Sequence, residues 1–540
     1  MAFIKAQKLK YDESGRIISG SAAIVDAVYI STGNKNHSTH KVRERLGKVL
    51  YLSDDRKSGI FLSPTRGIVE YDAITNKFTA VEKDDSRIVG EKLFPKTEIH
   101  TVFGDTYLIL DFLKKQGILA ILQNVFPKKE AYERVLCHVL HAVLRDGSRV
   151  SCDNFILKSF ASYLFQDVPI SSLNSDTRFF SLLGEDHTKM AFFKVFVDFM
   201  KSKYPDFGKA CYVDSTPLPN DIKDNPFNAL CSHGISASAI MTRLVLIIDK
   251  VTGLPVWYDI IPGNVLDVNT IRIITADVSD NLGIEIDSLV LDAGYVSKDL
   301  ITTFHIGTER TFIGRMPAKK GYPYKDLYWQ VKDLLLNGKY VFARNGHTYF
   351  GVRKQIEIFG EQMFAYVYVD KENALTRFNK YLEENEEEYE RMKDKDKTWM
   401  NVKFGYFVLL SNQEMTPKEL LSEYFARTMI ESMFKTCKEY LELLPLSKWS
   451  NQTVRGKILH DIINTICLLL LRKQLIDSSK SVSEILGKCQ SLMCFKNDRD
   501  IVTVETPSKQ VKEYYNLFGT DVPAHVDLKK YIPLIMNAKV

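Results

Sequence analysis

The sequence lacks the features that build secreted or membrane-bound proteins. Its eight Cys include no CxxC pair and no spacing typical of disulfide-rich domains, which indicates buried free thiols in a reducing compartment. The first ten residues, MAFIKAQKLK, contain three lysines and no apolar core of a signal peptide. The longest apolar run, TICLLLL at 465–471, is far too short to cross a bilayer. We therefore expect a cytoplasmic protein with no membrane partner.

A strong excess of charge of one sign is also missing. The chain has 72 basic and 67 acidic residues, a net charge of +5, so any nucleic-acid surface must come from local clustering. A length of 540 residues with 45% hydrophobic content is enough for two to four domains with real cores.

Patterning along the chain predicts regions of different structure. Alternation around an Ile-Thr-Asn turn in 68–82 indicates strands, whereas apolar spacing of i, i+3, i+4 from 101 onward indicates helices. From 209 the order becomes strand, hairpin strands, helix, strand, helix, strand, which is typical of a mixed α/β sheet. We predict a β-rich N-terminal module (1–100), a helical region (101–205), two parts of one α/β core (206–316 and 411–478), a β-rich insertion that interrupts the core (317–410), and a C-terminal region of unassigned role (479–540).

Several local elements are specific enough to test. The segment 239–263 predicts a hairpin around Lys250–Gly253, and 267–283 predicts a helix that ends at Gly283. The segment 339–370 predicts a β-meander with turns at Asn345-Gly346 and Phe359-Gly360, followed by a charged helix at 372–395.

Two segments could contact DNA, although each has a plainer interpretation. SSLNSDTRFFSLLG (171–184) predicts a short helix, a turn and a second helix capped by Asn174 or Ser175, which is either a DNA-reading helix-turn-helix or ordinary structure. The cations Lys41, Arg43, Arg45 and Lys48 could contact phosphates, but four charges of this kind more commonly form a solvated surface.

The stretch YFARTMIESMFKTCK (424–438) carries polar side chains at helical spacing. Tyr424, Arg427, Glu431 and Lys438 lie at offsets 0, 3, 7 and 14, and at roughly 100° per residue they fall within about 60° of one another on one α-helix. A stripe with one acid among cations suits a metal ligand beside anion-binding groups. A solvated face with an Arg427–Glu431 pair would give the same pattern.

Two aspartates provide partners for that acid. Asp214 and Asp292 each end an apolar strand and precede a turn, so they converge if the two strands are neighbours. With Glu431 they form a set of hard oxygen ligands, which favours Mg²⁺ or Mn²⁺ over Zn²⁺. Two such ions about 3.5–4 Å apart are the usual device for in-line attack at a phosphodiester.

These motifs resemble those of bacterial insertion-sequence transposases of the DDE class, in the branch with a Tyr-x2-Arg-x3-Glu-x6-Lys signature. Residues 424–438 match that spacing at every position, and the YVDST and LDAGY segments resemble the first and second aspartate boxes of the family. GLPVWYDIIPGNVLDVNT between them resembles the family's Gly-x-Pro…Pro-Gly-Asn-x-x-Asp run. The resemblance covers roughly 100–475.

The resemblance implies an RNase H-like catalytic domain with a β-rich insertion before the helix that carries the glutamate. It implies that Asp214, Asp292 and Glu431 are catalytic and bind two Mg²⁺ or Mn²⁺ ions, one activating water and later the 3′-hydroxyl, the other stabilising the leaving oxygen. Tyr424, Arg427 and Lys438 would bind DNA phosphates.

The expected activity is Mg-dependent cleavage of element ends and their transfer to target DNA. The expected partners are double-stranded DNA (terminal inverted repeats and target) and a second copy of the chain on paired ends, with a nucleoid location in a bacterial cytoplasm when bound to DNA. Two other functions remain open: a catalytically inactive DNA-binding regulator, and a nuclease that cuts without strand transfer.

Overall fold

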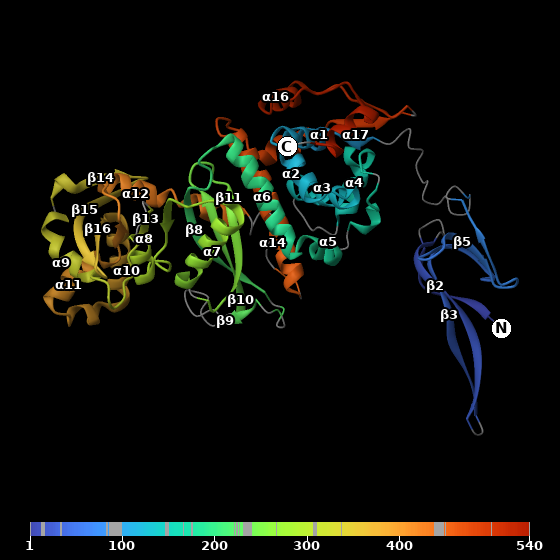
Figure 1. Ribbon diagram of the computed structural model, residues 1–540, viewed down its shortest axis with the longest axis horizontal. Coiled ribbons are helices and arrows are strands. Elements are labelled where there is room, and N and C mark those ends of the chain that lie inside the picture. The colour runs from blue at the N-terminus through green and yellow to red at the C-terminus, as the bar shows by residue number, and fades with distance from the viewer. Residues whose placement is uncertain are drawn as a thin grey trace. The chain divides into compact units, whose positions relative to one another are not determined.

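The computed structural model divides the chain into two compact units, Met1–Ile99 and His100–Val540, each of which is described by itself (Figure 1). The structure describes residues 2–11, 17–32, 35–53, 55–82, 85, 100–145, 151–165, 167–173, 176–220, 222, 225, 227–230, 240–265, 267–305, 310–335, 337–436, 446, 448, 450–497 and 499–538.

The N-terminal unit is an antiparallel meander in which each strand pairs with the next one in the chain. Its strands are β1 (Ala2–Tyr11), β2 (Ile17–Thr32), β3 (Lys35–Leu52), β4 (Ser58–Ser63), β5 (Gly67–Asp72) and β6 (Lys77–Ala80). One face of the sheet is apolar and buries Ile4, Ile24, Leu46, Phe61 and Tyr71. The alternation in 68–82 therefore gives the β5–β6 hairpin, as predicted.

The larger unit is built on a mixed sheet. Its first five strands lie in the order β11-β10-β8-β12-β13, with β8, β12 and β13 parallel and β10 and β11 antiparallel to their neighbours. Their bounds are β8 (Ala210–Pro219), β10 (Ile240–Asp249), β11 (Pro255–Pro262), β12 (Ser288–Leu291) and β13 (Thr311–Arg315), and a short β9 (Ala229–Leu230) pairs with β10. The prediction of an α/β fold with a mixed sheet is confirmed, and this strand order is consistent with an RNase H-like core.

The same sheet continues beyond β13. The strand β17 (Tyr406–Ser411) pairs with β13, and β16 (Glu361–Asp370), β15 (His347–Ile358) and β14 (Val341–Arg344) follow in turn. The segment 317–410, predicted as a β-rich insertion, carries these strands, and they extend the edge of the sheet through β17. That pairing links strands about a hundred residues apart, which local alternation does not reveal.

Turn chemistry in the meander follows the sequence. Asn345 and Gly346 both have positive φ, as do Phe359 and Gly360, which is the backbone that two-residue hairpin turns require. The predicted charged helix at 372–395 is two helices, α10 (Lys371–Glu390) and α11 (Asp394–Lys403), with a non-helical Asn385 inside α10. A further helix, α9 (Tyr324–Leu335), precedes β14.

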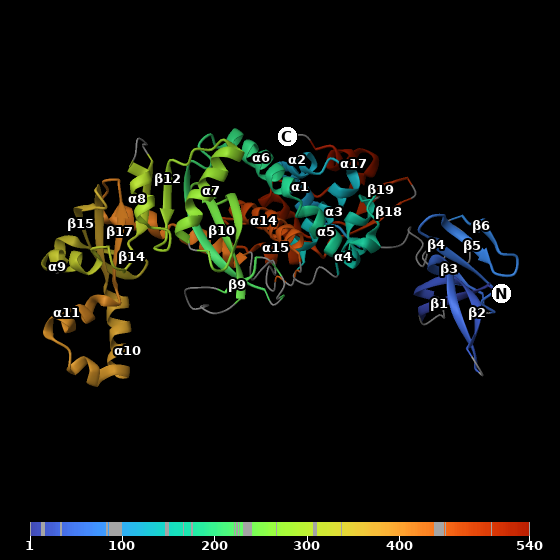
Figure 2. The ribbon, with the colours of Figure 1, turned by 60° about the horizontal axis from the view of Figure 1, so that its bottom comes forward.

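Helices pack around the part of the sheet that contains β10 (Figure 2). The contacts to β11 come from α6 (Asp186–Lys203), α7 (Asp267–Leu282) and α14 (Asn451–Gln474). The helix α14 is buried on nearly all sides, and its buried residues include polar ones such as Lys457, His460 and Asp461 beside the apolar run that ends at Leu471. The predicted helix at 267–283 is confirmed, and Gly283 with φ 57° follows its last residue.

A layer of helices packs on α14 through α3 (Lys129–Leu144) and α5 (Asp176–Leu183). Its other helices are α1 (Gly104–Lys115), α2 (Ile118–Val125) and α4 (Cys152–Lys158). In the segment considered as a helix-turn-helix, α5 packs so closely on α14 that a Cβ on Gly184 would overlap the Gln452 carbonyl oxygen. The predicted caps Asn174 and Ser175 lie outside the described residues.

The C-terminal residues return to the start of the larger unit. The strand β18 (Met493–Lys496) pairs with β7 (Thr101–Val102), and β19 (Ile501–Val504) and β20 (His525–Asp527) complete that small sheet. The remaining helices are α15 (Val482–Cys489), α16 (Lys509–Leu517) and α17 (Leu528–Met536). The six Cys within the described residues are free and buried, as predicted. Of the helices that the structure describes, none is long and apolar enough for a membrane span.

Candidate active site

Two aspartates stand at the same level on neighbouring strands. In the parallel pairing of β8 with β12, Leu291 lies opposite Val213, so Asp214 and Asp292 are the next residues on each strand. Adjacent strands lie about 4.8 Å apart, which places the two carboxylates side by side at the carboxyl end of β12. The sequence predicted this convergence, but its placement of Asp214 at a strand end before a turn is wrong, because β8 continues to Pro219 and Asp214 lies opposite Leu246 of β10.

The helix that carries the third acid is not continuous. The prediction of one helix over 424–438 is wrong, because α12 (Pro417–Phe425) ends before Arg427 and α13 (Thr428–Lys435) begins after it. Ala426 and Arg427 keep helical φ with ψ near −20°, and the amides of Arg427 and Met429 bond to carbonyls three residues earlier, the geometry of a 3₁₀ turn. The tighter turn still leaves Arg427 and Glu431 within ion-pair distance of each other.

Arg427 lies among the three carboxylates. Its Nη1 donates a 2.8 Å hydrogen bond to Oδ2 of Asp214, and its Nη2 lies 3.7 Å from Oδ1 of Asp292 and 3.8 Å from Oε1 of Glu431. One guanidinium therefore holds together acids from β8, the β12 end and α13. Asp214 is the most enclosed of them, with 17% of its side chain exposed against 41% for Asp292 and 59% for Glu431.

The charges do not balance at this centre. Burial raises the pKa of Asp214 to about 6, and the neighbouring Asp292 and Glu431 add to the rise, while Arg427 opposes it. Burial alone would lower the pKa of Arg427, but Tyr424 and the three carboxylates together raise it. A single guanidinium thus leaves an excess of negative charge that a further cation would neutralise.

Tyr424 contacts the same centre from α12. Its hydroxyl donates a 3.1 Å hydrogen bond to Oδ1 of Asp292, and only 4% of the residue is exposed. Burial raises the pKa of this phenol well above its usual range, so it stays protonated and acts as a donor. Lys438, the fourth member of the predicted stripe, lies outside the described residues.

Two further contacts, one beside Asp214 and one that joins α12 to the β10–β11 turn, have no signal in the sequence. Arg243 of β10 is buried and donates to the Ser215 hydroxyl, next to Asp214, and to the Val265 carbonyl. Lys250, at the β10–β11 turn, forms an ion pair with Glu423 of α12. Each joins residues at least twenty apart in the chain, so only the fold reveals them.

The donor set fits a divalent cation with hard-ligand preference. Asp214, Asp292 and Glu431 offer carboxylate oxygens in excess of their one cationic neighbour, and no His or Cys contacts them among the described residues. Carboxylate oxygens are the ligands that Mg²⁺ and Mn²⁺ prefer.

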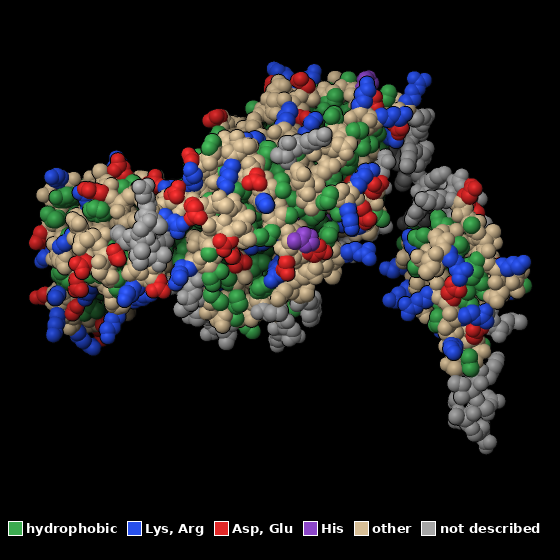
Figure 3. Space-filling model, in the orientation of Figure 1, with side chains coloured by type: hydrophobic (Ala, Val, Ile, Leu, Met, Phe, Trp, Pro, Cys, Tyr) green, Lys and Arg blue, Asp and Glu red, His purple; other side chains and the backbone are tan. Residues whose placement is uncertain are grey.

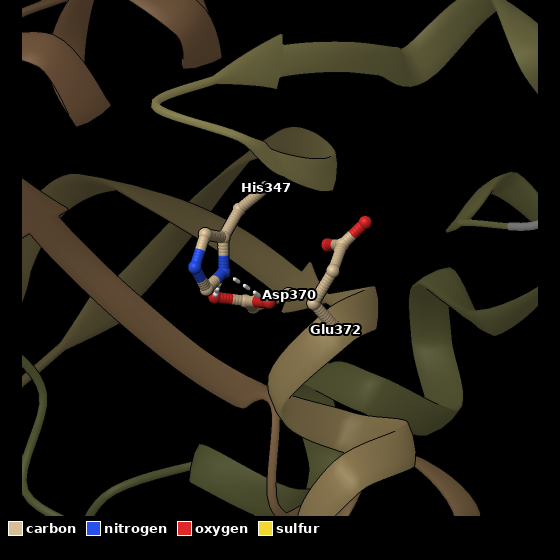
Figure 4. Close-up of side chains that lie close together, drawn as sticks. All are labelled: His347, Asp370 and Glu372. Atoms are coloured by element: carbon tan, nitrogen blue, oxygen red, sulfur yellow. Dashed lines mark hydrogen bonds and ion pairs between the residues drawn. The ribbon is translucent and has the colours of Figure 1, made fainter.

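A second acidic group lies elsewhere on the same sheet. His347, Asp370 and Glu372 place one possible ligand atom each within 4.8 Å of one another (Figure 4). Hydrogen bonds already use these atoms: His347 Nδ1 lies 2.9 Å from Asp370, Asp370 caps α10 through the Asn373 amide, and Glu372 accepts from the Thr348 amide. The group is therefore explained as a helix cap with an ion pair.

The site is therefore a cluster of three carboxylates, two from neighbouring strands of a mixed α/β sheet and one from a packed helix. Comparison with known proteins agrees: residues 210–460 match the family model described as "Transposase DDE domain", a span that contains Asp214, Asp292 and Glu431. No curated protein matches the chain. Among solved structures, the chain is similar to the piggyBac transposase in its synaptic complex with hairpin DNA, with 11% identity, 81% of this chain and 86% of that chain covered, and a TM-score of 0.38.

Proposed function

We propose that this chain is a transposase that binds the ends of a mobile DNA element, cleaves phosphodiesters at those ends and joins the 3′ ends to target DNA. The observation that carries the proposal is the convergence of Asp214, Asp292 and Glu431 around Arg427 within the segment that matches the DDE domain. The Tyr-Arg-Glu-Lys signature supports the insertion-sequence branch of that class.

In this proposal the three acids hold two divalent ions. Asp214, fixed by burial, forms the inner side of the centre, and the more exposed Asp292 and Glu431 face incoming DNA. When bound, the ions would activate the attacking oxygen and neutralise charge on the leaving oxygen.

The chain's own residues position the acids and the DNA. The Tyr424 hydroxyl fixes one oxygen of Asp292, while Arg427 keeps Asp214 close to the other two acids. The Arg427 guanidinium, whose five donors form a planar fork, would suit bidentate contact with a phosphate of the scissile strand when the acids hold metal. Lys438 would add a further phosphate contact.

The chemistry is two successive in-line displacements. In the first, a water oxygen bonds to phosphorus as the bond from phosphorus to the 3′ oxygen breaks, and that oxygen leaves as a 3′-hydroxyl. In the second, this hydroxyl attacks a target phosphodiester and displaces another 3′ oxygen, so no high-energy cofactor is consumed. A second copy of the chain on the paired end would carry out the same steps.

The test uses purified protein, labelled duplexes that carry the inverted repeats flanking the coding region, Mg²⁺ and a target plasmid. Cleaved ends joined to the plasmid are the expected products. Cleavage without joined product would instead identify a nuclease, and binding without cleavage a regulator. The same reaction with EDTA in place of Mg²⁺ is expected to give no cleavage.

A further inference from the structure

The positive charge of the chain is concentrated in its N-terminal unit. Residues 1–99 contain 17 Lys and Arg against 13 Asp and Glu, a net charge of +4 out of +5 for the whole sequence. The larger unit is nearly neutral, and its visible face mixes basic and acidic side chains (Figure 3). A sequence-independent attraction for a polyanion is therefore expected mainly from residues 1–99.

Cations gather on one face of the N-terminal sheet. Directly opposite residues on adjacent strands project to the same side, and Lys5 of β1, Ala23 of β2 and Arg45 of β3 form one such row. The next row is Gln7, Ser21 and Lys48. Lys5, Arg45 and Lys48 are all exposed, and we call these two rows the basic face.

A β-bulge is what brings the two β3 cations together. Residues three apart in a regular strand point to opposite faces, so Arg45 and Lys48 would be separated. Here Ala22 lies opposite Gly47 and Ala23 opposite Arg45, which leaves Leu46 as the extra residue and restores Lys48 to the face of Arg45. Gly47 has φ 97°, and a Cβ at that position would overlap the Leu62 carbonyl oxygen, so only glycine fits.

The described carboxylates of β1–β3 lie on the opposite side. Asp26 follows Ile24 by two residues, and Glu44 lies opposite Ile24, which belongs to the apolar face. Each is paired there, Asp26 with Arg43 and Glu44 with Arg66. Asp26 and Glu44 therefore do not reduce the positive potential of the basic face. The described carboxylates on its side are Glu70 and Asp72 of β5, since Lys48 lies opposite Leu62 and Leu62 lies opposite Ile68.

We propose that the basic face binds the phosphate backbone of double-stranded DNA, and that it does so without regard to sequence. Strands about 4.8 Å apart place Lys5 and Arg45 roughly 10 Å from each other, with only the short Ala23 between them. The small side chains Ser21 and Ala23 let a duplex approach the sheet while the longer cations reach phosphate oxygens. The choice of DNA as the polyanion rests on the proposed function.

The test compares two triple variants of the full-length protein. One is Lys5→Gln with Arg45→Gln and Lys48→Gln; the charge-matched control is Arg56→Asn with Lys57→Gln and Lys77→Gln, three exposed cations elsewhere in the unit. Binding of an arbitrary-sequence labelled duplex is measured by fluorescence anisotropy between about 50 and 200 mM salt, where the neutralisation of phosphates dominates affinity. Thermal melting of both proteins checks that they are folded.

We expect the basic-face variant to bind roughly tenfold more weakly, with a salt slope reduced by about 0.9 for each phosphate that is no longer neutralised, whereas the control keeps the wild-type slope. If the triple variant does not fold, the three single substitutions are each expected to reduce the slope by about 0.9. An unchanged slope or an equal reduction in the control would overturn the proposal. So would a greater loss of binding to single-stranded RNA than to the duplex when the basic-face variant is compared with wild type.

A failure of the proposed function would look different. Asp214→Asn leaves the basic face intact and is expected to bind the arbitrary duplex with the wild-type salt slope. Loss of cleavage chemistry would therefore appear in the end-joining reaction alone, while loss of the basic face would appear in duplex binding.

Discussion

Replacing Asp214 with Asn is expected to stabilise the protein in the absence of metal. Burial and two neighbouring acids raise the pKa of this carboxyl from 3.8 to about 6. Keeping it ionised at pH 8 therefore costs the folded protein about 3 kcal/mol, since each tenfold change in proton affinity corresponds to about 1.4 kcal/mol. Asn has the same shape, can still accept from Arg427 and has no charge to bury.

The effect has a defined dependence on pH. A carboxyl whose folded-state pKa is raised contributes stability that is fully present below its unfolded pKa and is lost as pH rises through the folded value. For Asp214 that loss falls between about pH 4 and pH 6. Wild type and variant should thus melt alike near pH 4, and the variant should be the more stable at pH 8.

The assay is thermal melting in EDTA and in Mg²⁺ at both pH values. A chain of two units need not unfold in one step, so the readout is the difference in Tm between the two proteins. In EDTA at pH 8 we expect the variant to melt a few degrees higher. Mg²⁺ should raise the Tm of wild type more than that of the variant, because only wild type has the full ligand set. A variant that melts lower at pH 8 in EDTA, or a difference that does not change with pH, would refute the charge imbalance.

Two further substitutions probe the contacts around the two acidic groups. Tyr424→Phe removes the donor to Asp292 but keeps the buried ring, so cleavage should slow about tenfold, as expected for the loss of a hydrogen bond to a charged group, with little change in Tm; equal single-turnover rates would show that the bond does not matter. His347→Gln removes the ion pair with Asp370, which raises the pKa of His347 and helps to lower that of Asp370, so the loss of stability should be greatest between about pH 4 and 6.5 and fade as the pH rises above the pKa of the histidine. The pair is partly exposed, so we expect no more than about 1 kcal/mol by denaturant unfolding, and a loss that is largest at pH 9 would contradict this account.

The sequence predicted the convergence of Asp214 and Asp292 because each follows a short apolar run, although only Asp292 follows the end of its strand, since β8 continues to Pro219. An apolar run followed by Asp and a turn identifies a buried strand and its carboxyl end, and two such strands in an α/β order are good candidates for neighbours. That Asp214 and Asp292 lie close together was therefore predicted without the structure. The hairpin at Lys250–Gly253 and both meander turns were equally local, since each depends on a dipeptide or short turn with a defined backbone.

What escaped prediction depends on contacts between distant residues. The 3₁₀ turn at Ala426–Arg427 does not change the helical spacing of apolar residues in the sequence. Only the packing shows that Arg427 points at three acids. The pairing of β17 with β13, and of β18 with β7, joins segments about a hundred and nearly four hundred residues apart. Patterning within a window of a dozen residues says which segments are strands but not which edges they join.

The central claim is that Glu431 completes a metal-dependent centre for DNA cleavage with Asp214 and Asp292. Glu431→Gln keeps the size of the side chain and removes its charge, so the most direct measurement compares cleavage and binding of labelled element ends by wild type and this variant in Mg²⁺. Our account predicts nearly unchanged DNA binding, because most of this side chain is exposed and no phosphate contact depends on its charge, together with loss of cleavage by about a hundredfold or more. Cleavage by the variant at the wild-type rate would contradict it.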